Sequence, residues 1–455
     1  MTAGSTNFPG ALDSHTGASP LGMGEVNNQA NTLATASHTN SVTTVTVAST
    51  SKFPSKGYIL VKRELISYTG TTATTFTGCT RGVGGTTATA FLSGTVVEQV
   101  VTAANHNDTA AAVVAVETAM GARLAYLTRK NRVINGDMRV CQRATLGSTD
   151  DTYTLDRWTL LLEAASAAAA SQETSDVPTD GSKYALKLTV GSGEDNKFGI
   201  ATYLEFRDVA DLRGKTISLQ AKLKTTAAIT DVRMAVLEWT GTADSVTSDV
   251  VGTWGSAGTN PTLASNWAYL GTPANLSVTT SWATYRVEGL TVGASANNLA
   301  VFIWCEDETT TVTTDSLLVT DVQLEEGPTC SGFERRPYGH ELWLCQRYYE
   351  ALGGVATFEP LGMGQYISTT VGRIFVQFAN RKRIAPTAAV SNIAHFELSF
   401  GAGSSATCSG SISTAYNGPT GRAVDFTIGA FGTTGNAVLL FTNTTSARFA
   451  FDAEM

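Results

Sequence analysis

Two tryptophans in the middle of the chain have the residue type and the surroundings of a sugar-binding site. Trp254 and Trp267 lie in stretches rich in Gly, Ser and Asn, which are typical of loops. A flat indole ring stacks on the apolar face of a sugar, and nearby Asn and Asp side chains bond its hydroxyls. Trp239 and Trp304 lie in strand-like segments and are interpreted as core residues. We therefore take Trp254 and Trp267 as carbohydrate-binding candidates.

The sequence carries no local motif of catalysis. It lacks GxSxG, HExxH, P-loop and GxGxxG motifs, and its five histidines are scattered. Two carboxylates brought together from distant strands would still suffice for sugar hydrolysis. The acidic run Glu306-Asp307-Glu308 is the most conspicuous candidate, and it is interpreted as a solvated loop. We expect a protein that is not an enzyme, with no cofactor and no metal site.

The composition argues against several other classes of protein. Asp and Glu outnumber Lys and Arg by 39 to 31, and the net charge of −8 argues against nucleic-acid binding. The six cysteines form no CxxC pair, so neither a zinc site nor a disulfide framework is expected. No stretch approaches the roughly 20 apolar residues of a membrane span, and the N-terminus lacks the pattern of a secretion signal. We expect synthesis in a reducing cytoplasm and no membrane insertion.

A length of 455 residues, rich in Thr, Ser, Ala and Gly, predicts several domains that are mainly β. Residues 1–35 show no periodicity and are predicted to have no core of their own. Residues 36–101 contain short alternating strands and predict a small β-module. Within it, RGVGGTT at 81–87 is interpreted as a tight turn, because it lacks the Gly-Lys-Thr/Ser ending of a phosphate loop.

Residues 102–128 contain the one long helical pattern, with Asn107 or Asp108 as its cap and many alanines. Its larger apolar residues form one stripe, at Val113, Val116, Met120, Leu124 and Leu127. The stripe either packs on the helix's own domain or joins copies of the chain, since it is shorter than a regular coiled coil. We favour a trimeric helical bundle, because β-modules flank the helix on both sides.

Residues 129–338 return to strand-like segments such as VRMAVLEW, NNLAVFIWC and SLLVTDVQLEE. They predict a jelly-roll-like β-sandwich in which Leu318, Val322 and Leu324 point inward. Residues 339–455 begin with a short helix at HELWLCQRYYEAL and continue as strands. They predict a second, smaller β-sandwich or barrel, which we call the tip.

The tripeptide Cys-Gln-Arg occurs at 141–143 and again at 345–347, at the entry and exit of the predicted sandwich. We interpret its Gln and Arg side chains as fastening these edges to neighbouring domains or subunits. Cys141 and Cys345 would then be buried small apolar residues. The alternative is a chance match of three residues.

Several stretches follow one another in an order that resembles tailed-bacteriophage tail fibre proteins. They are AANHNDTAAAVVAVETAMG, LTRKNRVINGDMRVCQR, YTLDRW, LEFRDVADLRGKTISLQAKLK and LLVTDVQLEEGPTCSGFERRPYGHELWLCQRYYE. The middle domain is similar to carbohydrate-binding β-sandwich modules of that group, and SKFPSKGYILVKRELISYTG resembles a small virion module. The resemblance implies a homotrimeric receptor-binding fibre that is made in the host cytoplasm and resides in the virion tail. Residues 1–35 would bind a tail or baseplate protein.

On this resemblance the tip faces the host and binds its surface polysaccharide or lipopolysaccharide. The Gly- and Ser-rich segments at 401–410 and 415–422 are predicted to be exposed loops, in which Tyr416, Asn417 and Arg422 supply a ring, an amide and a charge. The same residues also occur in ordinary hairpin turns. Two other functions stay open: a tailspike depolymerase, and a head fibre or capsid decoration protein.

Overall fold

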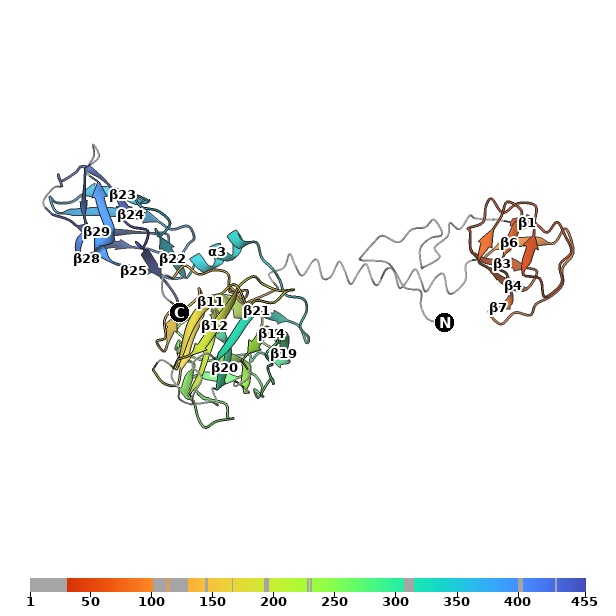
Figure 1. The fold of residues 1–455 in the computed structure, drawn as a ribbon, viewed down its shortest axis with the longest axis horizontal. Coiled ribbons are helices and arrows are strands. Elements are labelled where there is room, and N and C mark those ends of the chain that lie inside the picture. Colours follow the sequence, from red (N-terminus) through yellow and green to blue (C-terminus); the bar gives the residue numbers. More distant parts are fainter. Residues whose placement is uncertain are drawn as a thin grey trace. The chain divides into compact units, whose positions relative to one another are not determined.

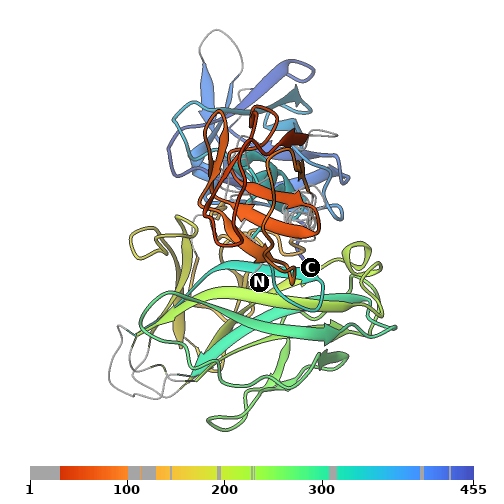
Figure 2. The ribbon, with the colours of Figure 1, turned by 90° about the vertical axis from the view of Figure 1, so that its right-hand side faces the viewer.

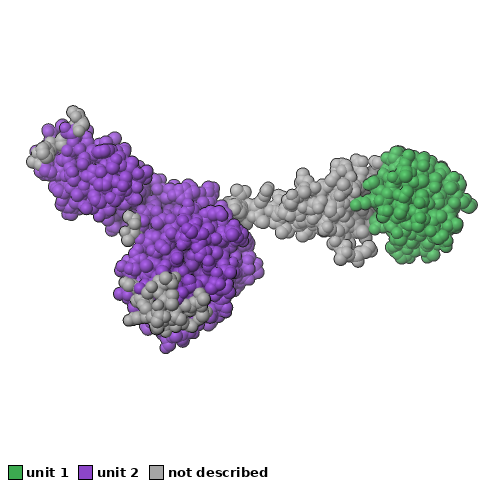
Figure 3. Space-filling view, in the orientation of Figure 1, with its two compact units in different colours: residues 1–128 green, residues 129–455 purple. Residues whose placement is uncertain are grey.

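The structure is a computed structural model, and it describes the following ranges of the chain. These are residues 31–100, 113, 130–143, 146–165, 167–191, 196–226, 229, 231–306, 315–399, 404–429 and 432–455. The chain divides into two compact units, residues 1–128 and 129–455 (Figure 3). Antiparallel strands dominate the described part of each unit, so the prediction of a mainly β protein is confirmed.

The first unit contains a small β-module with its own apolar core, which includes Val45, Ile59 and Phe76. Its five-stranded sheet has the order β1 (Asn31–Leu33), β8 (Val96–Gln99), β3 (Gly57–Val61), β4 (Glu64–Tyr68) and β7 (Thr80–Val83). Its three-stranded sheet has the order β2 (Thr44–Thr46), β6 (Thr75–Thr77) and β5 (Gly70–Thr71). Because β1 pairs with β8, Asn31–Leu33 belongs to the sheet of this module, although the prediction placed the module from residue 36 onward.

The RGVGGTT segment consists of the end of β7 followed by the predicted turn at Gly84 and Gly85, and an ion pair holds it in place. Arg81 donates from Nε and Nη2 to the carboxylate of the buried Glu64, at 2.7 Å each. Gly82 and Gly84 adopt φ of 64° and 65°, a left-handed conformation that favours glycine. The two glycines therefore allow the left-handed backbone conformation that this segment requires.

The predicted helix lies almost entirely outside the described residues. Val113 is helical and 51% exposed. The other members of the predicted trimer seam, Val116, Met120, Leu124 and Leu127, are not described. Association of copies through this helix therefore stays a prediction, as does any role for residues 1–30.

The sandwich consists of two antiparallel sheets that enclose one core (Figures 1 and 2). One sheet has the order β18 (Trp267–Tyr269), β15 (Val232–Trp239), β20 (Asn298–Glu306), β13 (Lys197–Leu204), β10 (Thr159–Leu162) and β9 (Thr152–Tyr153). The other has the order β11 (Ala168–Glu173), β12 (Ala185–Val190), β21 (Ser316–Glu326), β14 (Thr216–Thr225) and β19 (Ala283–Thr291). A short helix, α2 (Phe206–Val209), and the pair β16 (Val251–Thr253) and β17 (Thr262–Leu263) complete it. The predicted sandwich is confirmed.

The tip is a second, smaller sandwich that follows α3 (Tyr338–Gln346). Its three-stranded sheet has the order β22 (Tyr349–Leu352), β31 (Phe449–Asp452) and β25 (Thr387–Val390). Its seven-stranded sheet has the order β27 (Ser405–Thr407), β26 (Phe396–Ser399), β30 (Ala437–Thr442), β23 (Pro360–Tyr366), β24 (Val371–Gln377), β29 (Gly421–Thr427) and β28 (Ser409–Asn417). Ile374, Phe426 and Phe449 belong to the core between these sheets.

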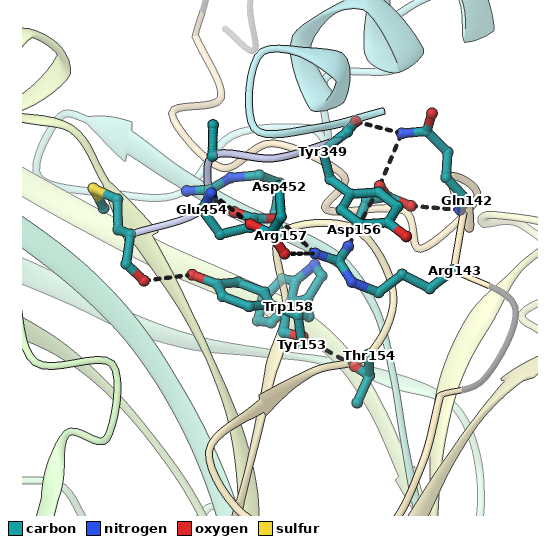
Figure 4. Close-up of polar contacts among 12 residues, drawn as sticks. Gln142, Arg143, Tyr153, Thr154, Asp156, Arg157, Trp158, Tyr349, Asp452 and Glu454 are labelled. Carbon is teal, nitrogen blue, oxygen red and sulfur yellow. Dashed lines mark hydrogen bonds and ion pairs between the residues drawn. The ribbon is translucent and has the colours of Figure 1, made fainter. Parts of the chain in front are cut away.

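A buried ionic network joins the sandwich to the tip; we call it the joint (Figure 4). Arg157 of the sandwich is 1% exposed and forms an ion pair with Glu454 of the tip. Its guanidinium carbon lies 3.5 Å from the centre of the Tyr348 ring. The Tyr153 hydroxyl donates to the carbonyl of Met455 at 3.1 Å. A buried charge is tolerated only when it is paired in this way, so the network holds the two sandwiches in one unit.

The first Cys-Gln-Arg tripeptide belongs to this joint (Figure 4). Gln142 donates to the Asp156 carboxylate at 2.9 Å and to the carbonyl of Tyr349 at 2.8 Å. The guanidinium of Arg143 lies 3.8 Å from the centre of the Tyr349 ring and 3.3 Å from the Glu454 carboxylate. Both side chains therefore reach from the entry of the sandwich to the tip.

The second tripeptide connects the same two domains, but its arginine reaches from the tip side back to the sandwich. Arg347, at the end of α3, donates to both carboxylate oxygens of Glu205 in the sandwich, at 2.8 Å each. The interpretation that the Gln and Arg side chains fasten domain edges is thus confirmed for Gln142, Arg143 and Arg347. All six cysteines are free; Cys345 is fully buried, whereas Cys141 is only half-buried.

Candidate functional site: a charged cleft on the sandwich

The outer face of the five-stranded sheet is polar because β14 alternates strictly. Ile217, Leu219, Ala221 and Leu223 of this strand belong to the core between the sheets. Gln220 and Lys222 therefore point to the opposite face, since successive side chains of a strand alternate. Their direct partners on β19 are Arg286 and Thr284, respectively. Two neighbouring strands thus place four polar side chains on one face.

The third strand, β21, adds Asp321 through an irregularity. Gln220 pairs with Gln323, but Lys222 pairs with Thr320, so β21 carries one extra residue at this point. Asp321 has φ of 49°, a conformation that Asp tolerates better than most residues. This bulge also corrects the predicted alternation. Leu317 and Val319 contribute to the core between the sheets, whereas Leu318, predicted to point inward, is buried outside that core.

The segment from Cys330 to Arg335 crosses the outer face and forms one wall of a cleft. It is tied down by hydrogen bonds from Gln220 Nε2 to the Ser331 carbonyl at 2.8 Å and from the Cys330 amide to Glu288 at 2.7 Å. The cleft has a volume of about 390 Å³. Its lining is Asp180, Gln220, Lys222, Thr284, Arg286, Asp321, Cys330, Ser331, Gly332, Phe333 and Arg335.

The charges of the cleft are only partly neutralised by one another. Lys222 Nζ lies 2.7 Å from Asp180 Oδ1 and 3.8 Å from Asp321 Oδ2. Arg335 Nη2 donates to the same Oδ2 at 3.0 Å. The hydrogen bond from Lys222 holds the pKa of Asp180 below its usual range. The cleft contains three cationic side chains, Lys222, Arg286 and Arg335, and two anionic ones, Asp180 and Asp321. Arg286 is exposed to solvent.

Asp321 is the most unusual of these groups, because it is 3% exposed and its Oδ1 has no hydrogen-bond partner. Burial raises the pKa of its carboxyl above the usual range, and Arg335 and Lys222 offset this effect only in part. A buried acceptor without a donor is energetically costly in the free protein. A ligand hydroxyl or ammonium group that donates to Oδ1 would remove that cost. Chemically, the cleft can therefore bind a small polar molecule with several donors and acceptors.

The described residues give no evidence of metal chemistry or of membrane insertion. No group of three or more His, Cys, Asp or Glu among them is arranged to hold a metal ion. No helix in the same ranges is long and apolar enough to span a membrane. Of the acidic run Glu306-Asp307-Glu308 noted in the sequence, Glu306 ends β20, and Asp307 and Glu308 lie outside the described residues.

Trp254 and Trp267 are buried, which corrects their prediction as exposed stacking rings. They are 8% and 6% exposed and belong to a second apolar cluster that includes Trp239. The Trp267 ring lies 5.2 Å from that of Trp239, and the Trp254 ring lies 6.0 Å from that of Phe302. Trp267 begins β18, an edge strand of the six-stranded sheet, and Trp254 directly follows β16. Both rings are buried because burying an indole outweighs the loop preference of the Gly and Ser around it.

The three tip candidates lie close together, but only two are exposed. Tyr416 is 69% exposed, and the guanidinium of Arg373 lies 5.4 Å from its ring centre. The amide of the exposed Asn417 donates to the Pro386 carbonyl at 3.0 Å. Arg422 is buried and donates to the same carbonyl, so the expectation that it presents a charge is wrong. Tyr416 and Asn417 lie in β28, whereas residues 401–403 of the predicted first loop are not described.

Sequence reasoning missed every residue of the cleft. The alternation of Gln220 and Lys222 along β14 was visible and marks a polar strand face. Nothing local indicated that Thr284 and Arg286 would pair with them, or that a bulge would turn Asp321 toward the same place.

No protein-family model matches the chain, and no curated protein matches it. Similar solved structures include the enzymatically active domain of tailspike protein 4 of bacteriophage CBA120, at 13% identity and a TM-score of 0.27. That match covers 43% of this chain and 21% of the tailspike chain. TmCBM61 in complex with beta-1,4-galactotriose is similar at 10% identity and a TM-score of 0.26, over 44% of this chain and 99% of that one. The CBM22-1 xylan-binding domain of Xyn10C from Paenibacillus barcinonensis is similar at 13% identity and a TM-score of 0.25, over 44% and 99%.

Proposed function

We propose that the chain is a non-enzymatic glycan-binding protein and that the cleft on the five-stranded sheet holds the glycan. The observation that carries this proposal is an open, charged cleft that is lined by a buried carboxyl, Asp321, whose Oδ1 lacks a hydrogen-bond partner. Sugar hydroxyls both donate and accept hydrogen bonds. They can donate to Oδ1 and accept from the cationic groups of Lys222, Arg286 and Arg335.

We further propose that the glycan belongs to a host surface polysaccharide or lipopolysaccharide, and that the chain is a tail fibre protein of a tailed bacteriophage. The ordered sequence stretches that resemble such fibres support this assignment. On this proposal the protein is a homotrimer in the virion tail, with residues 1–35 toward a tail or baseplate protein. Localisation of the protein on intact particles tests the tail assignment against a head fibre or decoration protein.

The glycan site is tested by filling the cleft without disturbing the fold. Thr284→Trp places an indole on an exposed position of the cleft lining. Thr291→Trp, an exposed position on the same strand outside the lining, is the matched control. Binding of the full chain to purified host polysaccharide should fall at least tenfold for Thr284→Trp and stay unchanged for the control. Equal binding by both variants would exclude this cleft, and release of reducing ends by the parent chain would contradict a non-enzymatic function.

A further inference from the structure

The outer face of the seven-stranded sheet in the tip carries an apolar band. Leu439, Met363 and Phe375 follow one another in register across β30, β23 and β24. Phe375 pairs next with Ala423 on β29, and Ala423 pairs with Tyr416 on β28. One row of cross-strand partners therefore runs through five strands without a formal charge. The core lies on the other side of these strands, where Leu440, Ile374 and Val424 are buried.

Most members of this band are exposed to a degree that is unusual for large apolar side chains. Met363 is 70%, Phe375 52%, Tyr416 69% and Leu439 37% exposed. Phe358, also exposed, extends the band at one end, with its ring 5.9 Å from that of Phe441. Together these side chains present on the order of 500 Å² of apolar surface, since a whole aromatic side chain offers about 150–250 Å². A contiguous patch of this size is typical of an interaction site.

The row itself carries no formal charge, and the arginine beside it is paired within the chain. Arg373, two residues from Phe375, donates from Nε and Nη2 to the Asp425 carboxylate at 2.8 and 3.0 Å. Glu397, the cross-strand partner of Phe441 at the end of the band, accepts from the Ser405 hydroxyl at 2.6 Å. A second identical band therefore meets an uncharged row flanked by one ion pair and one carboxylate. The area is below the roughly 800 Å² per partner of a standard interface between free proteins. It is sufficient between copies that are already held together, because tethering raises their effective concentration.

We propose that this band, made of Leu439, Met363, Phe375 and Tyr416, packs against the tip of a second copy of the chain. The inference deepens the proposed function, because it relies on copies being held together by the predicted helix at 102–128. Aromatic residues and Met are enriched in such contacts, and Lys and Glu are depleted, as in this band. The exposed Tyr416 would then serve assembly rather than glycan binding.

A cysteine placed in the band reports the contact directly. Full chains with Met363→Cys are oxidised mildly at micromolar concentration, and covalent pairs are counted on a non-reducing gel. The matched control is Ala389→Cys, an exposed position on β25 in the other sheet of the tip. We expect Met363→Cys to link at least tenfold faster than the control. Equal rates would overturn the proposal. Protection of the Met363→Cys thiol by added polysaccharide or phosphatidylcholine vesicles, without linking, would assign the band to those ligands instead.

A second variant separates the contact between tips from glycan binding in the cleft. Phe375→Asp places a charge in the band of every copy and should abolish the linking of Met363→Cys. Circular dichroism and polysaccharide binding should stay as in the parent, since Phe375 lies on the surface of the tip and the cleft lies on the sandwich. Sedimentation of the parent chain tests only whether copies are held together, as proposed for the predicted helix at 102–128. If the parent is oligomeric but Met363→Cys links no faster than Ala389→Cys, the tip contact is contradicted, whereas lost polysaccharide binding in Thr284→Trp bears only on the cleft.

Discussion

The joint and the cleft are built from the same kinds of side chain, yet they differ in how the charges are paired. In the joint, Arg157 and Glu454 are buried and paired with each other, and an aromatic ring covers the guanidinium. In the cleft, Arg286 is exposed, and a buried oxygen of Asp321 has no partner. The joint is not fully satisfied either, because the buried Arg157 Nε also lacks a hydrogen-bond partner. The difference is that the charges of the joint face one another inside the protein and stabilise the fold, whereas those of the cleft lie at its surface, where a ligand can reach them.

The largest expected effect comes from breaking the joint. Glu454→Ala leaves Arg157 buried without its carboxylate, and we expect a loss of about 3–5 kcal/mol in the free energy of unfolding. Glu326→Ala is the control, because its pair with Lys215 is nearly half exposed and is worth about 0–1 kcal/mol. Denaturant titration of both variants measures the difference. If they lose the same stability, the joint does not hold the unit together.

The next effect concerns the pH dependence of the joint. Burial raises the pKa of Asp156 from 3.8 to about 6, against the opposing charge of Arg143. The folded state then binds this proton more tightly than the unfolded state, so the contribution of Asp156 to stability falls as the pH rises from about 4 to 6. The stability of the parent minus that of Asp156→Asn should therefore decrease across this window, by up to about 3 kcal/mol. An increase with pH would show that Arg143 outweighs burial.

A smaller effect is expected in the cleft, and on binding rather than on stability. Asp321→Asn keeps the shape and the tolerance for positive φ but removes the charge that accepts from the ligand. Because one hydrogen bond to a charged group is worth about 1.5–3 kcal/mol, polysaccharide binding should weaken about 10–100-fold. Calorimetric titration measures it. Binding that stays unchanged while the protein remains folded would remove Asp321 from the site.

The smallest effect belongs to the exposed edge of the cleft. Arg286→Gln removes a solvent-exposed charge that is screened by salt, so a loss of about two- to fivefold in binding is expected at low ionic strength. The difference between parent and variant should shrink when the titration is repeated in about 0.5 M salt. A loss as large as that of Asp321→Asn, independent of salt, would mean that Arg286 makes a buried contact in the complex.

Strand content and domain order were predictable because they depend on local patterns. Strand-like segments such as VRMAVLEW and NNLAVFIWC in the sandwich, and those of the tip, indicated sheets, and sheets are present. The sites were not predictable for two reasons. A bulge at Asp321 shifts the faces of β21, and only its pairing with β14 reveals the shift. Burial also overrides loop composition, as it does for Trp254 and Trp267, and Arg422 is used inside the tip.

The joint also sets an order of events during synthesis. Arg157 and Glu454 are 297 residues apart in the chain. At about 5–20 residues per second, the ribosome needs roughly 15–60 s to make the intervening chain. During that time the sandwich already contains the arginine but cannot neutralise it, and β31, the central strand of the three-stranded tip sheet, is also missing. The ion pair that stabilises the joint can therefore form only after both the sandwich and the tip have been synthesised.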